Sequence, residues 1–226
     1  ETIDLTKLAF ELGFDGVLVV PPYYFRKATD NGLFLWFSEL IKKAVPSDGF
    51  LLGYHFPNVA GIGFSLELLA RLKDAFPTQF AGIKDSSHDA ELARTLGETF
   101  GSALAVFTGT DSYLQLAMQN QAAGCITAPA NILSPDLREA WDAMNAGTDS
   151  TEAQRRVKEQ RDILGQIILV IIPAEFVSKF LCKANVSLVL GLHFEDEAAD
   201  RSFRGPGLGS CQKGRRRALA ALRALR

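Results

Sequence analysis

The sequence predicts an α/β fold in which parallel strands alternate with helices and curve into a (β/α) barrel. Helical and extended patterns alternate along the chain as far as residue 127. The strand segments are continuous apolar runs, as in Gly16-Val-Leu-Val-Val20, which is typical of strands buried on both faces of a parallel sheet. No G-x-G-x-x-G or G-x-x-x-x-G-K-[ST] motif follows a strand, so neither a dinucleotide site nor a P-loop is indicated. The barrel is therefore favoured over the doubly wound sheet.

The first two helix–strand units follow from periodicity and from the residues that end each element. Residues 3–12 place apolar side chains at helical spacing, and Gly13 closes that helix. The strand at residues 16–20 ends at a pair of prolines. A second helical stretch at residues 33–45 leads to a strand at residues 50–54.

Three further units follow, and each helix begins at a residue whose side chain accepts from unpaired backbone N–H groups of the first turn. These N-cap residues are Ser65, Asp89 and Asp111. The strands expected after the three helices span residues 80–84, 103–107 and 124–127.

Helices dominate the rest of the chain. Ser134 is expected as an N-cap with Pro135 at the first helical position. A long helix is expected at residues 150–172, and another at residues 174–183. The last segment, residues 215–226, has an Ala/Leu/Arg helix pattern. The buried stripe of the first of these helices is expected to be Leu137, Trp141 and Met144.

Composition excludes several classes of protein. The chain has 226 residues with 24 basic and 26 acidic side chains, so its net charge of −2 gives no electrostatic footprint for nucleic acid or an anionic membrane. The apolar run at residues 163–172 is too short for a membrane span and is interpreted as a buried helix. Three widely spaced cysteines without a CxxC pair indicate neither a disulfide framework nor a zinc cluster, which fits the cytoplasm.

Chemistry is expected at the carboxyl ends of the strands, where barrel enzymes build their active sites. Lys84 ends an apolar run there. If its stem points into the barrel, desolvation favours the neutral amine, which is a nucleophile toward carbonyl groups and forms a Schiff base. The competing interpretation, of similar weight, is a lysine that leaves the sheet for solvent.

Tyrosines gather at the same strand ends. Tyr54 and the pair Tyr23-Tyr24 are placed to relay protons to and from an imine, because a phenol held near an amine acts as acid and base by turns. Each taken alone is more commonly a core or interface aromatic.

The three histidines are given no catalytic role. His55 lies on the opposite face of its strand from Tyr54 and is expected to pack, whereas His88 and His193 are expected to be solvated. No grouping of His, Cys, Asp and Glu has metal-ligand spacing, so no metal is expected.

Three segments resemble the dihydrodipicolinate synthase and N-acetylneuraminate lyase family of class I aldolases. They are Gly13-Phe-Asp-Gly-Val-Leu-Val-Val-Pro-Pro-Tyr-Tyr24, Gly53-Tyr-His-Phe-Pro57 and Gly82-Ile-Lys-Asp-Ser-Ser87. Their order and spacing agree with the family over residues 1–185.

The resemblance implies a barrel in which Lys84 forms an imine with pyruvate or a related 2-oxo acid, with no separate cofactor. It also implies that Tyr54 carries protons beside this imine. Tyr24 matches a tyrosine that reaches across a subunit contact into the neighbouring active site, so a homo-oligomer, dimer or tetramer, is expected.

The resemblance further indicates where the two substrates bind. Gly109 and Asp111 match the strand end that binds the second substrate in sialic acid lyases, and Ile126 matches a residue that lines the pyruvate pocket. The expected substrate-binding residues are Tyr23, Gly109, Thr110, Asp111 and Ile126.

Two departures from the family pattern refine this expectation. Synthases of the lysine pathway carry an arginine, two residues after the Tyr-x-x-Pro proline, that holds the carboxylate of the aldehyde, and this position is Val59 here. The family's Gly-Thr-Thr-Gly-Glu motif, which binds the pyruvate carboxylate, is absent, and a whole barrel needs about 250 residues. We therefore expect an N-terminally truncated chain that holds strands four to eight of a (β/α)8 barrel, followed by C-terminal helices. The expected parts are a partial barrel at residues 1–148, a helical region at residues 149–185 and an atypical tail at residues 186–226.

The sequence thus predicts a carbon–carbon lyase that joins or cleaves pyruvate and an aldehyde, nearer the N-acetylneuraminate lyase and sugar-acid aldolase branch. Alternatives left open are a 4-hydroxy-tetrahydrodipicolinate synthase, a non-catalytic relative that binds a 2-oxo or sugar acid, and an inactive fragment.

Overall fold

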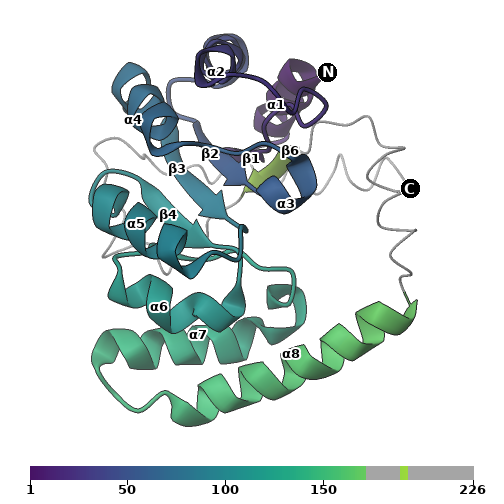
Figure 1. Cartoon of the computed structure of the whole chain (residues 1–226), viewed down its shortest axis with the longest axis vertical. Helices are drawn as coiled ribbons and strands as arrows, with labels where there is room; N and C mark the ends of the chain where they lie inside the picture. Colours follow the sequence, from purple (N-terminus) through teal and green to yellow (C-terminus); the bar gives the residue numbers. More distant parts are fainter. Residues whose placement is uncertain (172–188, 193–226) are drawn as a thin grey trace. The chain divides into compact units, whose positions relative to one another are not determined.

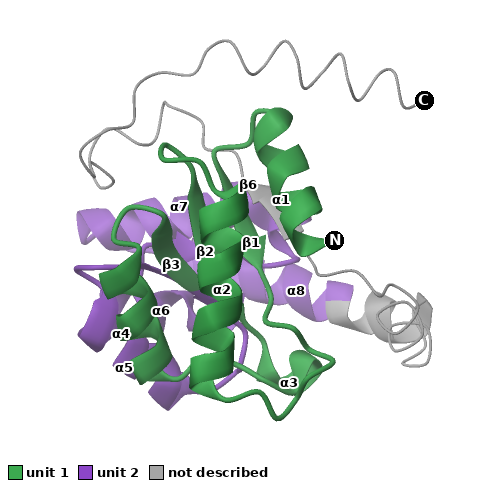
Figure 2. Cartoon of the chain, turned by 90° about the horizontal axis from the view of Figure 1, so that it is seen from above, with its two compact units in different colours: residues 1–83, 187–226 green, residues 84–186 purple. Residues whose placement is uncertain are grey.

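A computed structural model describes residues 1–171 and 189–192 of the chain. Two compact units are present, one of residues 1–83 with 187–226 and one of residues 84–186, and we call them unit 1 and unit 2 (Figure 2). The helices expected at residues 174–183 and 215–226, and His193, lie outside the described residues.

Unit 1 alternates helices and strands as the sequence predicts (Figure 1). β1 (Gly16–Val19) runs parallel to β2 (Phe50–His55), with Gly16 opposite Phe50. β6 (Val189–Leu192) pairs with β1 in the antiparallel sense, and β3 (Phe80–Asp85) lies beside β2, so the strand order is β6-β1-β2-β3. The last two residues of β3 belong to unit 2. The helices of unit 1 are α1 (Thr2–Glu11), α2 (Asp30–Ala44), α3 (Pro57–Ala60) and α4 (Leu66–Ala75).

Side-chain caps set the starts of the two longer helices that follow β1 and β2. The Ser65 hydroxyl accepts from the backbone N–H of Leu68 at 3.0 Å, which confirms the predicted start of α4. The Thr29 hydroxyl accepts from the N–H of Gly32 at 3.2 Å. This cap starts α2 at Asp30, three residues before the apolar periodicity indicates.

Aromatic side chains fill the core of unit 1. Phe37, Phe64 and Phe80 are buried, and the Phe64 ring centroid lies 5.1 Å from that of Phe37 and 6.5 Å from that of Phe80. A Cβ on Gly53 would stand 2.7 Å from the Phe64 ring. The missing side chain at this position of β2 therefore lets the ring lie against the strand.

Unit 2 continues the alternation after the end of β3. β4 lies between β3 and β5, and it runs parallel to β5 with Phe107 opposite Gly124. The elements are α5 (Ala90–Phe100), β4 (Ala105–Thr108), the 3-10 turn η1 (Asp111–Tyr113), α6 (Leu114–Gln119), β5 (Gly124–Cys125), α7 (Ala130–Ala146) and α8 (Thr151–Ile171). The Asp89 carboxylate accepts from the N–H groups of Glu91 and Leu92, so the predicted cap of α5 is confirmed.

A second apolar cluster lies where α7 packs against α8 (Figure 1). Trp141 and Met144 pack against this cluster, as the predicted stripe of α7 requires. The buried members are Leu114, Leu133, Leu137, Ala140, Ala153 and Val157.

The predicted start of α7 is wrong. α7 begins at Ala130, and Ser134 and Pro135 lie inside the helix rather than at its N-cap and first position. The N–H of Ile132 bonds the carbonyl of Pro129, three residues back, so a tight first turn forms before the proline. A Ser-Pro pair usually starts a helix, because proline has no N–H and is tolerated in the first turn. Here the helix has already begun, one turn before this pair.

Two strands differ in length from the prediction, and one helix differs from it in burial. The strand expected at residues 103–107 is β4, at 105–108, and the one expected at residues 124–127 keeps only its first two residues in β5. Ile163 on α8 is 56% exposed, so the interpretation of residues 163–172 as a buried helix is wrong at its first residue. No helix within residues 1–171 has the length and apolar composition of a membrane span.

Five parallel strands, β1 to β5, place consecutive strands side by side within each unit. A doubly wound sheet reverses its strand order at a switch point, whereas a (β/α) barrel does not. The sequential order therefore agrees with an arc of a barrel. The described strands do not close into a ring, since β6 occupies the outer edge of β1. The boundaries proposed near residues 148 and 185 remain a prediction.

Candidate active site

Lys84 is a buried lysine at the carboxyl end of β3. It is 8% exposed, and Asp85 and Ser86 after it are 6% and 4% exposed. The interpretation of Lys84 as a residue that leaves the sheet for solvent is therefore excluded. A lysine is rarely buried without a functional or ionic reason, which makes this strand end the centre of the candidate site.

The loops that follow β3 and β4 are joined beside Lys84. The backbone N–H of Gly109 donates to the carbonyl of Asp85 at 2.6 Å. A Cβ on Gly109 would stand 1.9 Å from the Ser86 hydroxyl oxygen and 2.9 Å from the Asp85 carbonyl oxygen. Glycine at this position therefore allows the two strand ends to approach closely.

Asp111 has an ionic partner rather than the predicted N-cap role. The N-cap of the 3-10 turn is Thr110, and it makes no side-chain cap bond. The Asp111 carboxylate, 6% exposed, accepts from Nη1 of Arg161 on α8 at 3.0 Å. The predicted cap is wrong because a buried carboxylate needs a charged or strongly donating partner, and α8 supplies one 50 residues later.

Cys125, on β5 of unit 2, responds to the charges of this strand-end site. Burial, and after it the charge of Asp111, raise the pKa of its thiol, the charge of Lys84 lowers it, and the net result is a pKa of about 12. Because both charges act on this partly buried thiol, Lys84, Asp111 and Cys125 lie in one neighbourhood of unit 2.

We expect Cys125 to react slowly with iodoacetamide at pH 8. A raised pKa leaves a small thiolate fraction, and the higher nucleophilicity of that thiolate offsets only part of the loss, so the rate should be tens of fold (~30) below that of free cysteine. Peptide mass spectrometry after timed labelling measures the Cys125 rate separately. Labelling as fast as free cysteine would contradict the raised pKa of this partly buried thiol.

Tyr54 and His55 occupy adjacent positions at the end of β2 in unit 1. Tyr54 is 8% exposed, and its ring stacks on Phe56 with centroids 5.5 Å apart. His55 is also buried, and its Nδ1 accepts from the N–H of Phe64 at 2.9 Å. This bond fixes the loop after α3 and confirms the predicted packing role of His55.

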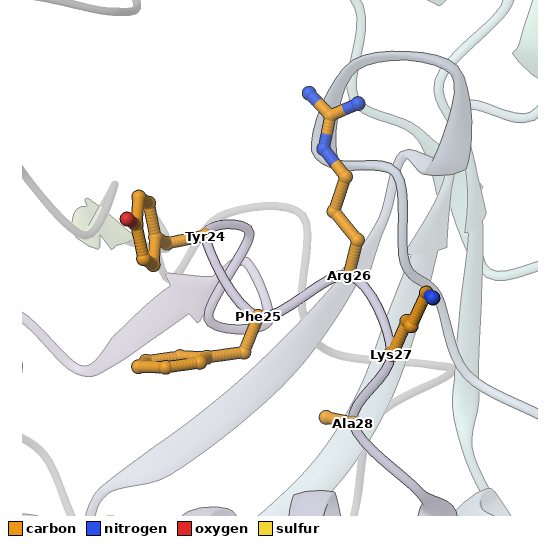
Figure 3. A pocket seen from close by; sticks show the side chains of 5 residues that line it. All are labelled: Tyr24, Phe25, Arg26, Lys27 and Ala28. Atoms are coloured by element: carbon orange, nitrogen blue, oxygen red, sulfur yellow. The ribbon is translucent and has the colours of Figure 1, made fainter.

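The loop after β1 carries the tyrosine pair and lines a surface depression of about 580 Å³ (Figure 3). Tyr24 is 81% exposed and meets Phe25 edge-to-face, with ring centroids 5.4 Å apart. Figure 3 shows these two rings on the same side of the loop, whereas the Arg26 side chain extends away from them. Tyr23 is half-buried. An exposed aromatic pair of this kind is typical of a contact surface.

The predicted site residues therefore fall into two sets, one in each unit. Unit 2 brings together Lys84, Gly109, Thr110, Asp111 and Ile126, whose N–H donates to the carbonyl of Thr108 at 2.9 Å. Unit 1 holds Tyr23, Tyr24 and Tyr54. Within the described part of the chain, no group of three or more His, Cys, Asp and Glu side chains is placed to hold a metal ion.

Sequence reasoning missed two residues of the unit 2 site. Arg161 lies on a helix far along the chain, and nothing in its local pattern indicates Asp111 as its partner. His88 is exposed, as predicted, but Nδ1 of its ring lies 3.2 Å from the Thr110 hydroxyl. The one available signal for His88 was its place just before the N-cap Asp89.

Two curated proteins match the chain over 74% and 65% of its length. The chain is 35% identical over 167 residues to an uncharacterized DapA-like lyase of Chloroflexus aurantiacus, covering 74% of this chain and 55% of that one. It is 37% identical over 147 residues to the 4-hydroxy-tetrahydrodipicolinate synthase of Thermus thermophilus, covering 65% of this chain and 48% of that one. The chain thus spans about half the length of the curated relatives it matches.

A solved structure extends the likeness to three dimensions. Dihydrodipicolinate synthase from Acinetobacter baumannii, determined in complex with pyruvate, is 26% identical to the chain with a TM-score of 0.62. The match covers 98% of this chain and 69% of that one.

The strand order and the buried lysine at a strand end define an α/β protein with a candidate site at the carboxyl ends of its strands. The family model described as the dihydrodipicolinate synthetase family matches residues 1–179. The chain belongs to this family.

Proposed function

We propose that the protein is a Schiff-base lyase that condenses pyruvate or a related 2-oxo acid with an aldehyde, or cleaves the product. The observation that carries the proposal is the burial of Lys84 at the end of β3, in a chain of this family. The relative solved with pyruvate supports a 2-oxo acid as the first substrate.

The proposed reaction balances without a metal or a separate cofactor. The Lys84 amine attacks the C2 carbonyl of pyruvate, and loss of water gives an imine. Loss of a proton from the methyl carbon gives an enamine, whose carbon attacks the aldehyde carbon and forms the C–C bond. Water then hydrolyses the imine, which releases the product and restores the amine. Tyr54 and Tyr24 are the proposed proton carriers.

Substrate contacts are proposed for the other candidate residues. Gly109, Thr110 and Asp111 would contact the aldehyde, and Ile126 and Tyr23 would line the site. Tyr24, with its ring 81% exposed beside Phe25, would contact a second copy of the chain, in a homo-oligomer of two or four subunits.

The second substrate is proposed to be a hydroxylated aldehyde, as in the N-acetylneuraminate lyase and sugar-acid aldolase branch. Val59, on α3 and 43% exposed, presents an alkyl group where lysine-pathway synthases present an arginine. An alkyl group does not bind a carboxylate. The alternative is a 4-hydroxy-tetrahydrodipicolinate synthase, which the Thermus thermophilus relative favours.

Reduction with borohydride in the presence of pyruvate tests the proposal. We expect the chain to gain the mass of one reduced pyruvyl group, located at Lys84 by peptide mass spectrometry, because hydride converts the imine into a stable secondary amine. Reduction without pyruvate is the control. No mass gain at Lys84 at saturating pyruvate would contradict the proposed lyase. Two activity assays distinguish the two branches. Release of pyruvate from N-acetylneuraminate would indicate the lyase branch, and condensation of pyruvate with a carboxylate-bearing aldehyde would indicate the synthase.

A further inference from the structure

His88 has an unusual backbone conformation next to the candidate site. Its φ is 62°, in the left-handed region that favours glycine and disfavours side chains with a Cβ. The position follows Lys84 by four residues, in the loop between β3 and α5. Strained residues of this kind persist where surrounding structure fixes them, and they concentrate at functional sites.

Two hydrogen bonds with the segment that follows β4 hold His88 in this conformation. Nδ1 of its ring lies 3.2 Å from the Thr110 hydroxyl, and its carbonyl accepts from the Tyr113 hydroxyl at 3.1 Å. The preceding residue, Ser87, is also fixed, because its N–H donates to the Asp85 carboxylate at 2.9 Å. His88 is therefore held beside the β4 strand end, although the residue stays exposed to solvent.

The remaining ring nitrogen is the chemically important one. Because Nδ1 faces Thr110, Nε2 is the nitrogen left for another partner, and it donates or accepts according to the tautomer. His88 is an exposed residue, so a small ligand in solvent can approach it. The ring is joined to Thr110, which stands between two other candidate substrate residues, Gly109 and Asp111.

We propose that His88 is a specificity-determining residue that hydrogen-bonds a hydroxyl group of the acceptor aldehyde through Nε2. This inference rests on the proposed function of Lys84. An imidazole nitrogen hydrogen-bonds a hydroxyl group as donor or as acceptor, so it selects hydroxylated acceptors over alkyl ones. The proposed contact would then explain why His88 keeps a strained backbone at this position.

Replacement of His88 by glycine tests the proposal without a backbone penalty. Glycine adopts this φ readily, so His88→Gly should keep or raise the urea midpoint of unfolding. We expect kcat/KM for D-glyceraldehyde to fall about tenfold, the scale of one lost hydrogen bond, and kcat/KM for propanal to stay within about twofold. An unchanged ratio of the two acceptors would overturn the proposal.

A matched control and a direct binding measurement complete the experiment. Gln121 has a φ of 61° and is exposed, so Gln121→Gly gives the same backbone relief and should leave both acceptors unchanged. D-Glyceraldehyde, but not propanal, should shift the imidazole NMR resonances that His88→Asn removes. Absence of this shift overturns the role of His88, whereas absence of a borohydride-trapped adduct at Lys84 contradicts the proposed function, so the two failures are distinguishable.

Discussion

Replacement of Lys84 by arginine is expected to abolish the pyruvate adduct that borohydride traps and to lower lyase turnover at least about 1000-fold. Arginine keeps a long, polar side chain at this buried position. It remains protonated at all working pH values, so it has no free electron pair with which to attack the C2 carbonyl. Intact-mass spectrometry after reduction, followed by assay of pyruvate release, measures both effects.

Lys73→Arg is the matched control for this substitution. Lys73 lies on α4, where its ammonium donates to the carbonyl of Pro77 at 2.8 Å, and burial lowers its pKa. Lys73 thus has a lowered pKa but lies outside the proposed site. Its conversion to arginine should therefore leave formation of the pyruvate adduct unchanged. An adduct that persists in Lys84→Arg would place the imine elsewhere. Calorimetric pyruvate binding that survives Lys84→Ala, in a chain without turnover, would favour the non-catalytic relative.

Local signals account for the parts of the fold that the sequence predicted well. Continuous apolar runs identified β1, β2 and β3, because a strand buried on both faces needs no alternation. The caps at Ser65 and Asp89 were predictable because the hydroxyl or carboxylate and its N–H partners lie within three residues of one another. The same reasoning found Lys84, since its position after an apolar run is visible in the sequence.

Distant partners account for most of what the sequence did not predict. Asp111 carries the same cap signal as Asp89, yet its carboxylate pairs with Arg161, 50 residues away. β6 pairs with β1 across most of the chain, and no local pattern specifies that pairing. The left-handed φ of His88 depends on its contacts with Thr110 and Tyr113, which periodicity does not reveal.

Removal of the Arg161 side chain is expected to lower the free energy of unfolding by about 2–3 kcal/mol. An exposed ion pair contributes about 0–1 kcal/mol, and loss of one partner of a fully buried pair costs about 3–5 kcal/mol. The Asp111 side chain is 6% exposed and that of Arg161 is 28% exposed, so Arg161→Ala should fall between these limits. Urea denaturation measures the change. Lys158→Ala, which removes a well-exposed pair with Asp162 on the same helix, should cost less than about 0.5 kcal/mol.

A second substitution separates the cost of an unpaired charge from the cost of lost packing. In Arg161→Ala the Asp111 carboxylate stays buried without its ionic partner, so adding Asp111→Asn should recover more than half of the lost stability. If packing of the arginine stem against unit 2 were the main contribution, the double variant would be no more stable than Arg161→Ala. Recovery would show that α8 contributes a counter-ion to the buried Asp111 carboxylate of the strand-end site.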